Sequence, residues 1–98
     1  MAFKIPEKVK IGGITYEVKQ GVERLVKGQG YSAEIIYEDA VINLAKGCEV
    51  IAERDLWHEV IHAIKSNLGY KNHDEKEIDE LAGALYALIV DNPEMFGG

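Results

Sequence analysis

Three residues in the middle of the chain, within the stretch DLWHEVIHAIKSNLG, have the types and spacing of a metal site. His58 and His62 are four residues apart, so on a helix both imidazoles project from one face and can bind the same metal ion. Glu59 lies about 100° further around the helix than His58, which places its carboxylate beside the metal rather than on it. Two ligands and a neighbouring base predict metal-assisted hydrolysis, in which Glu59 accepts a proton from a metal-bound water. The alternative interpretation is two histidines and a solvated carboxylate that share a helix face.

A catalytic zinc site needs three protein ligands and one open position, so another ligand must come from elsewhere in the chain. The candidates are the third histidine and five acidic residues that follow it: His73, Asp74, Glu75, Glu77, Asp79 and Glu80. A tyrosine or histidine can also stabilise the oxyanion that develops during hydrolysis. Tyr70, His73 and Tyr86 are candidates for that role, and Tyr86 shares a helix face with Asp79. Each of them alone is better explained by a structural role.

The helix that must carry the HEVIH motif is predicted between Asp55, a suitable N-cap, and Gly69, a C-terminal stop. Its apolar residues recur at helical spacing: Leu56, Trp57, Val60, Ile61, Ile64 and Leu68. A second helix is predicted from Asp74, with Glu77 three residues later in a capping-box arrangement, and it stops before Pro93. Its core stripe is formed by Ile78, Leu81, Ala82, Leu85, Leu88 and Ile89.

The N-terminal half has the two-residue alternation of strands. In KVKIGGITYEVK the apolar residues alternate on both sides of Gly12-Gly13, which predicts a hairpin. AEIIYEDAVINLA reads as two short strands folded at Glu38-Asp39, or as one bent strand. We therefore expect one α+β domain over residues 1–98, with a β-rich half (1–48) and a helical half (53–92) that holds the site. Three or four antiparallel strands would pack on the two-helix hairpin.

Composition narrows the function classes. A net charge of -6 and a pI near 5.0 argue against a nucleic-acid surface, which needs clustered basic residues. The longest apolar stretch, LAGALYALIV, is about half the length needed to cross a bilayer, so no membrane partner is expected. The single cysteine, Cys48, cannot form an internal disulfide, and the start of the chain has no apolar run of a secretory signal. These features predict a cytoplasmic protein, and they leave its oligomeric state open.

HEVIH followed by EKEIDELA resembles the gluzincin arrangement, in which a second helix carries Glu-x-x-x-Asp. The compact size and β-rich N-terminus are similar to the ImmA/IrrE-like metallopeptidase domains common on phages and other mobile elements. The resemblance spans about residues 45–92 and is strongest at HEVIH. It implies that His58, His62 and Glu75 bind one Zn²⁺ per chain and that Asp79 supports a ligating histidine.

The third ligand remains open between two glutamates. A symmetric antiparallel hairpin would bring Glu80 level with His62, whereas Glu75 reaches the site only if the GYKNH loop folds back. Glu75 is favoured because Asp79, four residues on, can orient an imidazole. Glu80 lies between core positions and has no such partner.

Three functions follow from these features. The first is a zinc-dependent metallopeptidase with Glu59 as the base and a peptide or protein substrate, which would add a strand along the AVINLA edge. The second is a metal-binding regulatory module with little or no proteolytic turnover, because 98 residues leave little wall for a deep cleft. The third is an acidic structural or DNA-mimicking protein in which both histidines are dispensable.

Overall fold

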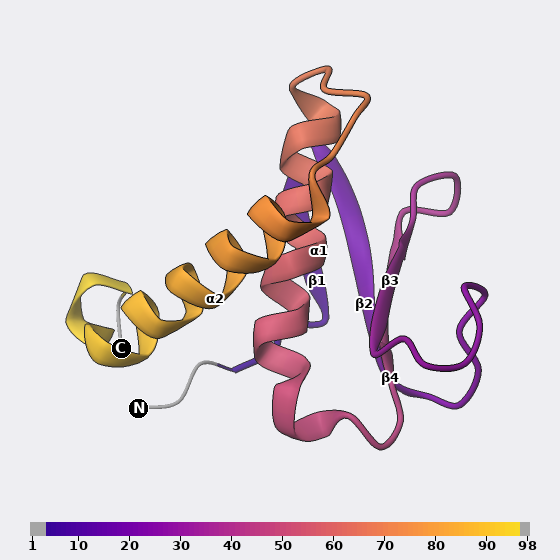
Figure 1. Cartoon of the computed structure of the whole chain (residues 1–98), viewed down its shortest axis with the longest axis horizontal. Coiled ribbons are helices and arrows are strands. Elements are labelled where there is room, and N and C mark those ends of the chain that lie inside the picture. The colour runs from indigo at the N-terminus through magenta and orange to yellow at the C-terminus, as the bar shows by residue number, and fades with distance from the viewer. Residues whose placement is uncertain (1–3, 97–98) are drawn as a thin grey trace.

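One long helix packs on a face of a four-stranded sheet, and a second helix begins beside the first and extends away from the sheet (Figure 1). The computed structural model describes residues 4–96 of the chain. Its elements are, in order, β1 (Lys8–Ile11), β2 (Ile14–Val22), β3 (Ala33–Ile36), β4 (Val41–Ala45), a 3-10 turn (Glu49–Ile51), α1 (Ala52–Asn67), α2 (Glu75–Asp91) and a second 3-10 turn (Pro93–Phe96). The predicted α+β class is confirmed. Within residues 4–96, neither helix combines the length and the apolar character that crossing a membrane requires.

Both predicted strand pairs form. Gly12 and Gly13 have φ values of 56° and 86°. Two successive positive φ values are typical of the two-residue hairpin turn whose twist matches that of the flanking strands. The turn sets β1 and β2 antiparallel, with Ile11 opposite Ile14. Likewise β3 and β4 are antiparallel, with Ile36 opposite Val41 on either side of the predicted fold.

The expectation of a wholly antiparallel sheet is wrong. The strand order is β1-β2-β4-β3, and β2 pairs with β4 in parallel, with Glu17 opposite Val41 and Lys19 opposite Asn43. The connection 23–32 carries the chain past the position of β4, so β3 forms the outer edge and β4 returns between β3 and β2. Alternation of apolar residues predicts which face of a strand is buried, but it contains no information on which strands become neighbours. The parallel pairing of β2 with β4 therefore results from the path of the connection 23–32, which the alternation does not predict.

The helix boundaries agree with the prediction at three of four ends. α1 begins at Ala52, after the 3-10 turn, so Asp55 lies in its first turn and is not its N-cap. At this position the positive end of the helix dipole still stabilises its carboxylate. Gly69, with φ 93°, ends the helix as predicted. The Asp74 side chain accepts hydrogen bonds from two backbone N–H groups of α2, which confirms it as the N-cap, and Pro93 follows the end of α2.

Two apolar clusters lie on different faces of α1. The larger one joins α1 to the sheet through Ile11, Tyr16, Val18, Ala33, Ile42, Leu44, Ala52, Leu56, Val60 and Ala63. The smaller one joins α1 to α2 through Ile61, Ile78 and Ala82, and Trp57 packs against both clusters. Ile64 and Leu68 are 41% and 67% exposed, although they continue the predicted stripe. Each step of four residues rotates the stripe by about 40°, so its last members have turned away from the sheet.

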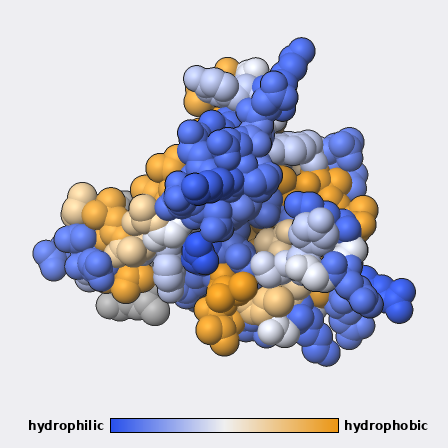
Figure 2. Space-filling model, viewed as in Figure 1, coloured by the Kyte–Doolittle hydropathy of each residue, from blue (hydrophilic) through white to orange (hydrophobic). Residues whose placement is uncertain are grey.

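The surface view separates polar from apolar regions of one face. Exposed apolar side chains occur at the far end of α2 (Leu88 and Val90), in the 3-10 turn that follows it (Met95) and in the 3-10 turn before α1 (Val50 and Ile51). Figure 2 shows a hydrophilic centre on this face, with apolar patches around it, one of them at the left over the far end of α2.

Candidate metal centre

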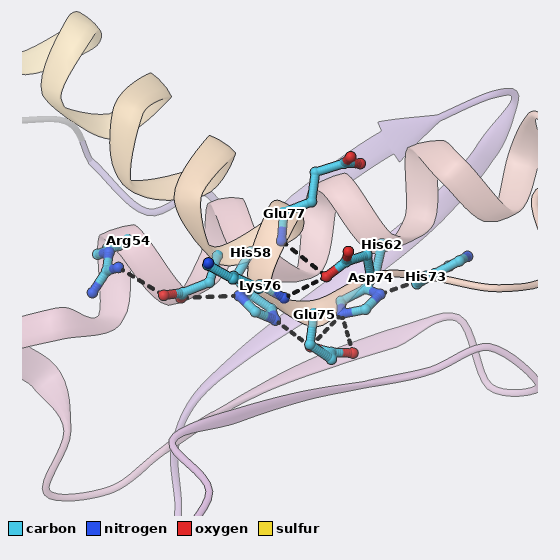
Figure 3. Close-up of polar contacts among 9 residues, drawn as sticks. Arg54, His58, His62, His73, Asp74, Glu75, Lys76 and Glu77 are labelled. Atoms are coloured by element: carbon cyan, nitrogen blue, oxygen red, sulfur yellow. Dashed lines mark hydrogen bonds and ion pairs between the residues drawn. The ribbon is translucent and has the colours of Figure 1, made fainter.

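The side chains of His58, His62 and Glu75 converge where α2 begins beside α1 (Figure 3). Nε2 of His58 lies 3.2 Å from one carboxylate oxygen of Glu75, and Nε2 of His62 lies 3.1 Å from the other. One potential ligand atom from each residue falls within 4.8 Å of the others. Among residues 4–96, no other histidine, cysteine or acidic residues form such a group of three.

Local structure explains how Glu75 reaches the two histidines. The chain reverses at the end of α1, where the N–H of Tyr70 donates to the carbonyl of Lys65 (3.0 Å). The loop then folds back, and the Asp74 cap starts α2 with Glu75 as its first residue. The positive end of the helix dipole favours a carboxylate at this position. The GYKNH loop therefore folds back toward α1, as Glu75 requires in order to reach the two histidines.

Glu80 lies outside this group. It is exposed on α2, and α2 diverges from α1 instead of running back alongside it (Figure 1). The symmetric hairpin that would bring Glu80 level with His62 does not form. Glu77 is also directed elsewhere, because its carboxylate pairs with Lys65 at 3.0 Å.

The other ring nitrogen of His58 faces Asp79. Its Nδ1 lies 3.4 Å from Oδ1 of Asp79, and Oδ2 of the same carboxylate accepts a hydrogen bond from Arg54 at 3.1 Å. A Cβ added at Gly83 would lie 3.3 Å from Nε of Arg54, so the glycine leaves room for the guanidinium over α2. Ligating imidazoles commonly have such a carboxylate behind them. Sequence reasoning identified Asp79 but missed Arg54, which is only brought near by the crossing of the two helices.

The other ring nitrogen of His62 faces His73. The two Nδ1 atoms are 2.7 Å apart, and Nε2 of His73 lies 2.9 Å from the carbonyl oxygen of Tyr70. His73 therefore lies behind His62, on the side away from Glu75 (Figure 3). His73 is not one of the three residues whose potential ligand atoms converge.

Glu59 lies beside the group in a largely buried position, with 6% of its surface exposed. Burial raises the pKa of its carboxyl from 4.5 to about 7, while the nearby charge of His58 opposes that shift and the charge of Glu75 adds to it. A base with a pKa near neutrality is suited to proton transfer at physiological pH. With His62 and Glu75 it lines an open cavity of about 540 Å³, which is bounded on the other side by β3.

The electrostatics of the three converging residues suit a cation. Burial lowers the pKa of His62, which favours the neutral imidazole that metals require. Burial alone would raise the pKa of Glu75, but His62 and His58 together hold it below its ordinary value, so the carboxylate remains ionised. Two imidazole nitrogens and one carboxylate beside a cavity form the donor set of a catalytic zinc site with one open position. The residues present therefore fit such an ion.

The phenols are arranged differently from the prediction. Tyr86 donates a hydrogen bond to Glu53 at 2.9 Å and does not line the cavity, and Tyr70 lines only a smaller neighbouring one. Tyr37, which sequence reasoning missed, lines both cavities. Burial and the charge of Glu59 raise its pKa. No motif marks Tyr37, because it reaches the site only through the turn between β3 and β4.

Comparison of the chain with protein-family models, with curated proteins and with solved structures finds no significant match. The gluzincin resemblance accordingly rests on the motifs HEVIH and EKEID. The geometry of the site is the remaining evidence for a function.

Proposed function

We propose that this protein is a zinc-dependent metallopeptidase, with one Zn²⁺ held by His58, His62 and Glu75. The observation that carries the proposal is the convergence of these three side chains beside a buried carboxylate, that of Glu59, at the wall of a cavity. A group of ligands alone would support metal binding. The additional base, with its raised pKa, supports hydrolysis.

The residues around the cavity divide the reaction between them. When bound, zinc supplies a positive charge that polarises the peptide carbonyl. Glu59 accepts a proton from the attacking water and passes it to the departing amine. Tyr37 is the phenol on the cavity wall, so we assign it, in place of Tyr86, to stabilise the developing oxyanion. Tyr37→Phe is expected to lower kcat with little change in KM.

The substrate path follows the edge of the sheet. The AVINLA strand is β4, which lies inside the sheet between β2 and β3 and cannot accept another strand, so that part of the prediction is wrong. β3 is the free edge on this side, and its residues Ile35 and Ile36 line the cavity together with Glu59. A substrate that pairs with β3 by β-augmentation would bring a peptide bond over the ligands.

The alternative, a metal-binding regulatory module with little turnover, is favoured by one observation. The side chain of Glu75 is 65% exposed, so the site is shallow and excludes little water. The two functions share the same ligands and differ in what Glu59 does.

The test has two stages. Zinc binding is measured by titration for the wild type, Glu75→Ala and Glu80→Ala; we expect one zinc per chain, lost in Glu75→Ala and kept in the matched control. Zinc-loaded wild type and Glu59→Gln are then incubated with a peptide mixture, and products are read by mass spectrometry. Cleavage by the wild type alone, with equal zinc content, supports the peptidase. Zinc binding without cleavage in either protein supports the regulatory module, and no zinc binding by the wild type removes both.

A cytoplasmic location belongs to the same proposal. It rests on the lone cysteine, which is half-buried and unpaired. Fractionation of cells that contain the protein tests it, with recovery in the cytoplasmic fraction as the expected result, and recovery elsewhere would contradict it.

A further inference from the structure

His62, His73 and the Tyr70 carbonyl form a continuous series of polar contacts behind the metal centre. Nδ1 of His62 lies 2.7 Å from Nδ1 of His73, and Nε2 of His73 lies 2.9 Å from the carbonyl oxygen of Tyr70. The two rings are stacked, with centroids 5.0 Å apart and planes 26° from parallel. Both nitrogens of His73 therefore have a partner.

The chemistry of the last partner sets the direction of every bond in this series. A carbonyl oxygen can only accept, so Nε2 of His73 carries the hydrogen and donates to Tyr70. In the neutral ring Nδ1 of His73 is then an acceptor, and the hydrogen between the two rings belongs to Nδ1 of His62. This leaves Nε2 of His62 as the nitrogen with a free lone pair, and it is the atom that faces Glu75.

We infer that His73 is a positioning residue, which fixes the tautomer and the orientation of His62 so that Nε2 is presented to the metal. The inference rests on the proposed function, because it assigns His73 a role toward a bound zinc. It replaces two roles that the sequence left open for His73, those of third ligand and of oxyanion stabiliser. Neither role is compatible with a ring whose two nitrogens are both directed elsewhere.

The two ligating histidines are then held in different ways. His58 has the carboxylate of Asp79 behind it, and this carboxylate is itself held by Arg54. His62 has a second imidazole behind it, that of His73, which contacts the backbone of the loop between α1 and α2. A carboxylate makes the ligating imidazole more basic, and a neutral acceptor does so less. His73 thus fixes the geometry of His62 without adding a third negative charge beside Glu59 and Glu75.

The loop position of His73 requires a test that separates hydrogen bonding from loop packing. His73→Phe keeps a ring but removes both polar contacts, whereas the amide oxygen of His73→Asn can replace Nδ1 as the acceptor while the bond to Tyr70 is lost. Zinc affinity is measured by competition with a chromogenic chelator for the wild type, both variants and His62→Ala. Circular dichroism of the metal-free proteins confirms that each is folded. In parallel, proton–nitrogen correlation spectra of the zinc-loaded proteins report which ring nitrogen of His62 carries hydrogen.

We expect His73→Phe to bind zinc about 10- to 100-fold more weakly than the wild type, which is the usual loss for a partner of a ligand. His73→Asn should recover most of that affinity. The Nδ1–H signal of His62 should be visible in the wild type and in His73→Asn. In His73→Phe it should be lost, because the hydrogen then exchanges with water.

Three outcomes would overturn the inference while leaving the proposed function intact. The first is a zinc affinity of His73→Phe equal to that of the wild type. The second is equal weakening of zinc binding in both variants with no change in the His62 signal. The third is a loss of zinc binding in His73→Phe as complete as in His62→Ala, which would make His73 a ligand. Failure of the wild type to bind zinc at all would remove the proposed function and this inference together.

Discussion

Oδ1 of Asp79 lies 3.4 Å from Nδ1 of His58, the ring nitrogen that does not face Glu75. The contact crosses from one helix to the other, and Arg54 approaches the same carboxylate from α1. One acidic residue thus contacts side chains of α1 from α2, behind the candidate metal centre.

Asp79→Ala is expected to weaken zinc binding by about 10- to 100-fold, because His58 loses the group that orients it. Arg54→Ala should weaken binding less, since Asp79 remains. Chelator competition measures both, and Glu80→Ala, which removes the exposed neighbouring carboxylate, is the control. Equal affinity in Asp79→Ala and Glu80→Ala would show that Asp79 is only a surface charge.

Glu59→Gln is expected to stabilise the metal-free protein at high pH. The pKa of Glu59 is raised in the folded state to about 7, above its ordinary 4.5. Its contribution to stability is therefore fully present below about 4.5 and is lost as the pH rises through about 7. At pH 8 the fold buries a carboxylate that the amide replaces, so we expect a gain of about 1–3 kcal/mol in the free energy of unfolding.

Urea unfolding of the chelator-treated wild type and Glu59→Gln at pH 8 and at pH 4.5 measures this gain. The difference should shrink toward the acidic end. A variant less stable than the wild type at pH 8 would mean that the Glu59 carboxylate has compensating partners in the folded state.

Glu34 should behave in the opposite way. It is buried on β3 and accepts hydrogen bonds from Asn43 and from the backbone N–H groups of Val26 and Lys27 at 2.7–3.0 Å. Burial alone would raise its pKa, but the bonds from Asn43 and the backbone outweigh burial, and the net pKa is lowered. The stability that this carboxylate contributes is thus present above about 4.5 and is lost as the pH falls through its lowered value.

Glu34→Gln is therefore expected to cost about 2 kcal/mol at pH 7, the range for hydrogen bonds to a charged group. The difference from the wild type should narrow below pH 4.5. Thermal unfolding across that pH range measures it. Val26 and Lys27 also form part of the cavity wall, so the loss of these bonds would loosen that wall as well.

The hairpin turn allows a matched pair of substitutions. A Cβ at Gly12 would collide with the side chain of Asn67 at the end of α1, whereas one at Gly13 has nothing within 4 Å. Both glycines have positive φ, so each alanine costs about 1–2 kcal/mol from backbone strain alone. Gly12→Ala should be the more destabilising of the two in urea unfolding, and adding Asn67→Ala should remove the difference between them.

The parts of the fold that depend on local sequence were predictable. The HEVIH helix, the Asp74 cap and the Gly12-Gly13 turn each depend on residues only a few positions apart. The order of the strands was not, because hydrophobic alternation is the same whichever neighbours a strand has. Arg54, Tyr37 and the placement of His73 behind His62 depend on helix crossing and loop path, which no short motif encodes.

The apolar part of the contact between the two helices is small, made by Ile61, Ile78 and Ala82 with Trp57 and Leu85 at its margin. The ion pairs Arg54–Asp79 and Lys65–Glu77 add polar contacts across the same junction. The candidate ligands are split across the same junction, two on α1 and one at the first residue of α2. Ion binding would therefore be thermodynamically linked to docking of α2, since the unfolded junction has no preformed site. Backbone amides of α2 would exchange with solvent more slowly in zinc, while those of the sheet would change little. Under the proposed function, the order of α2 would then depend on whether the ion is bound.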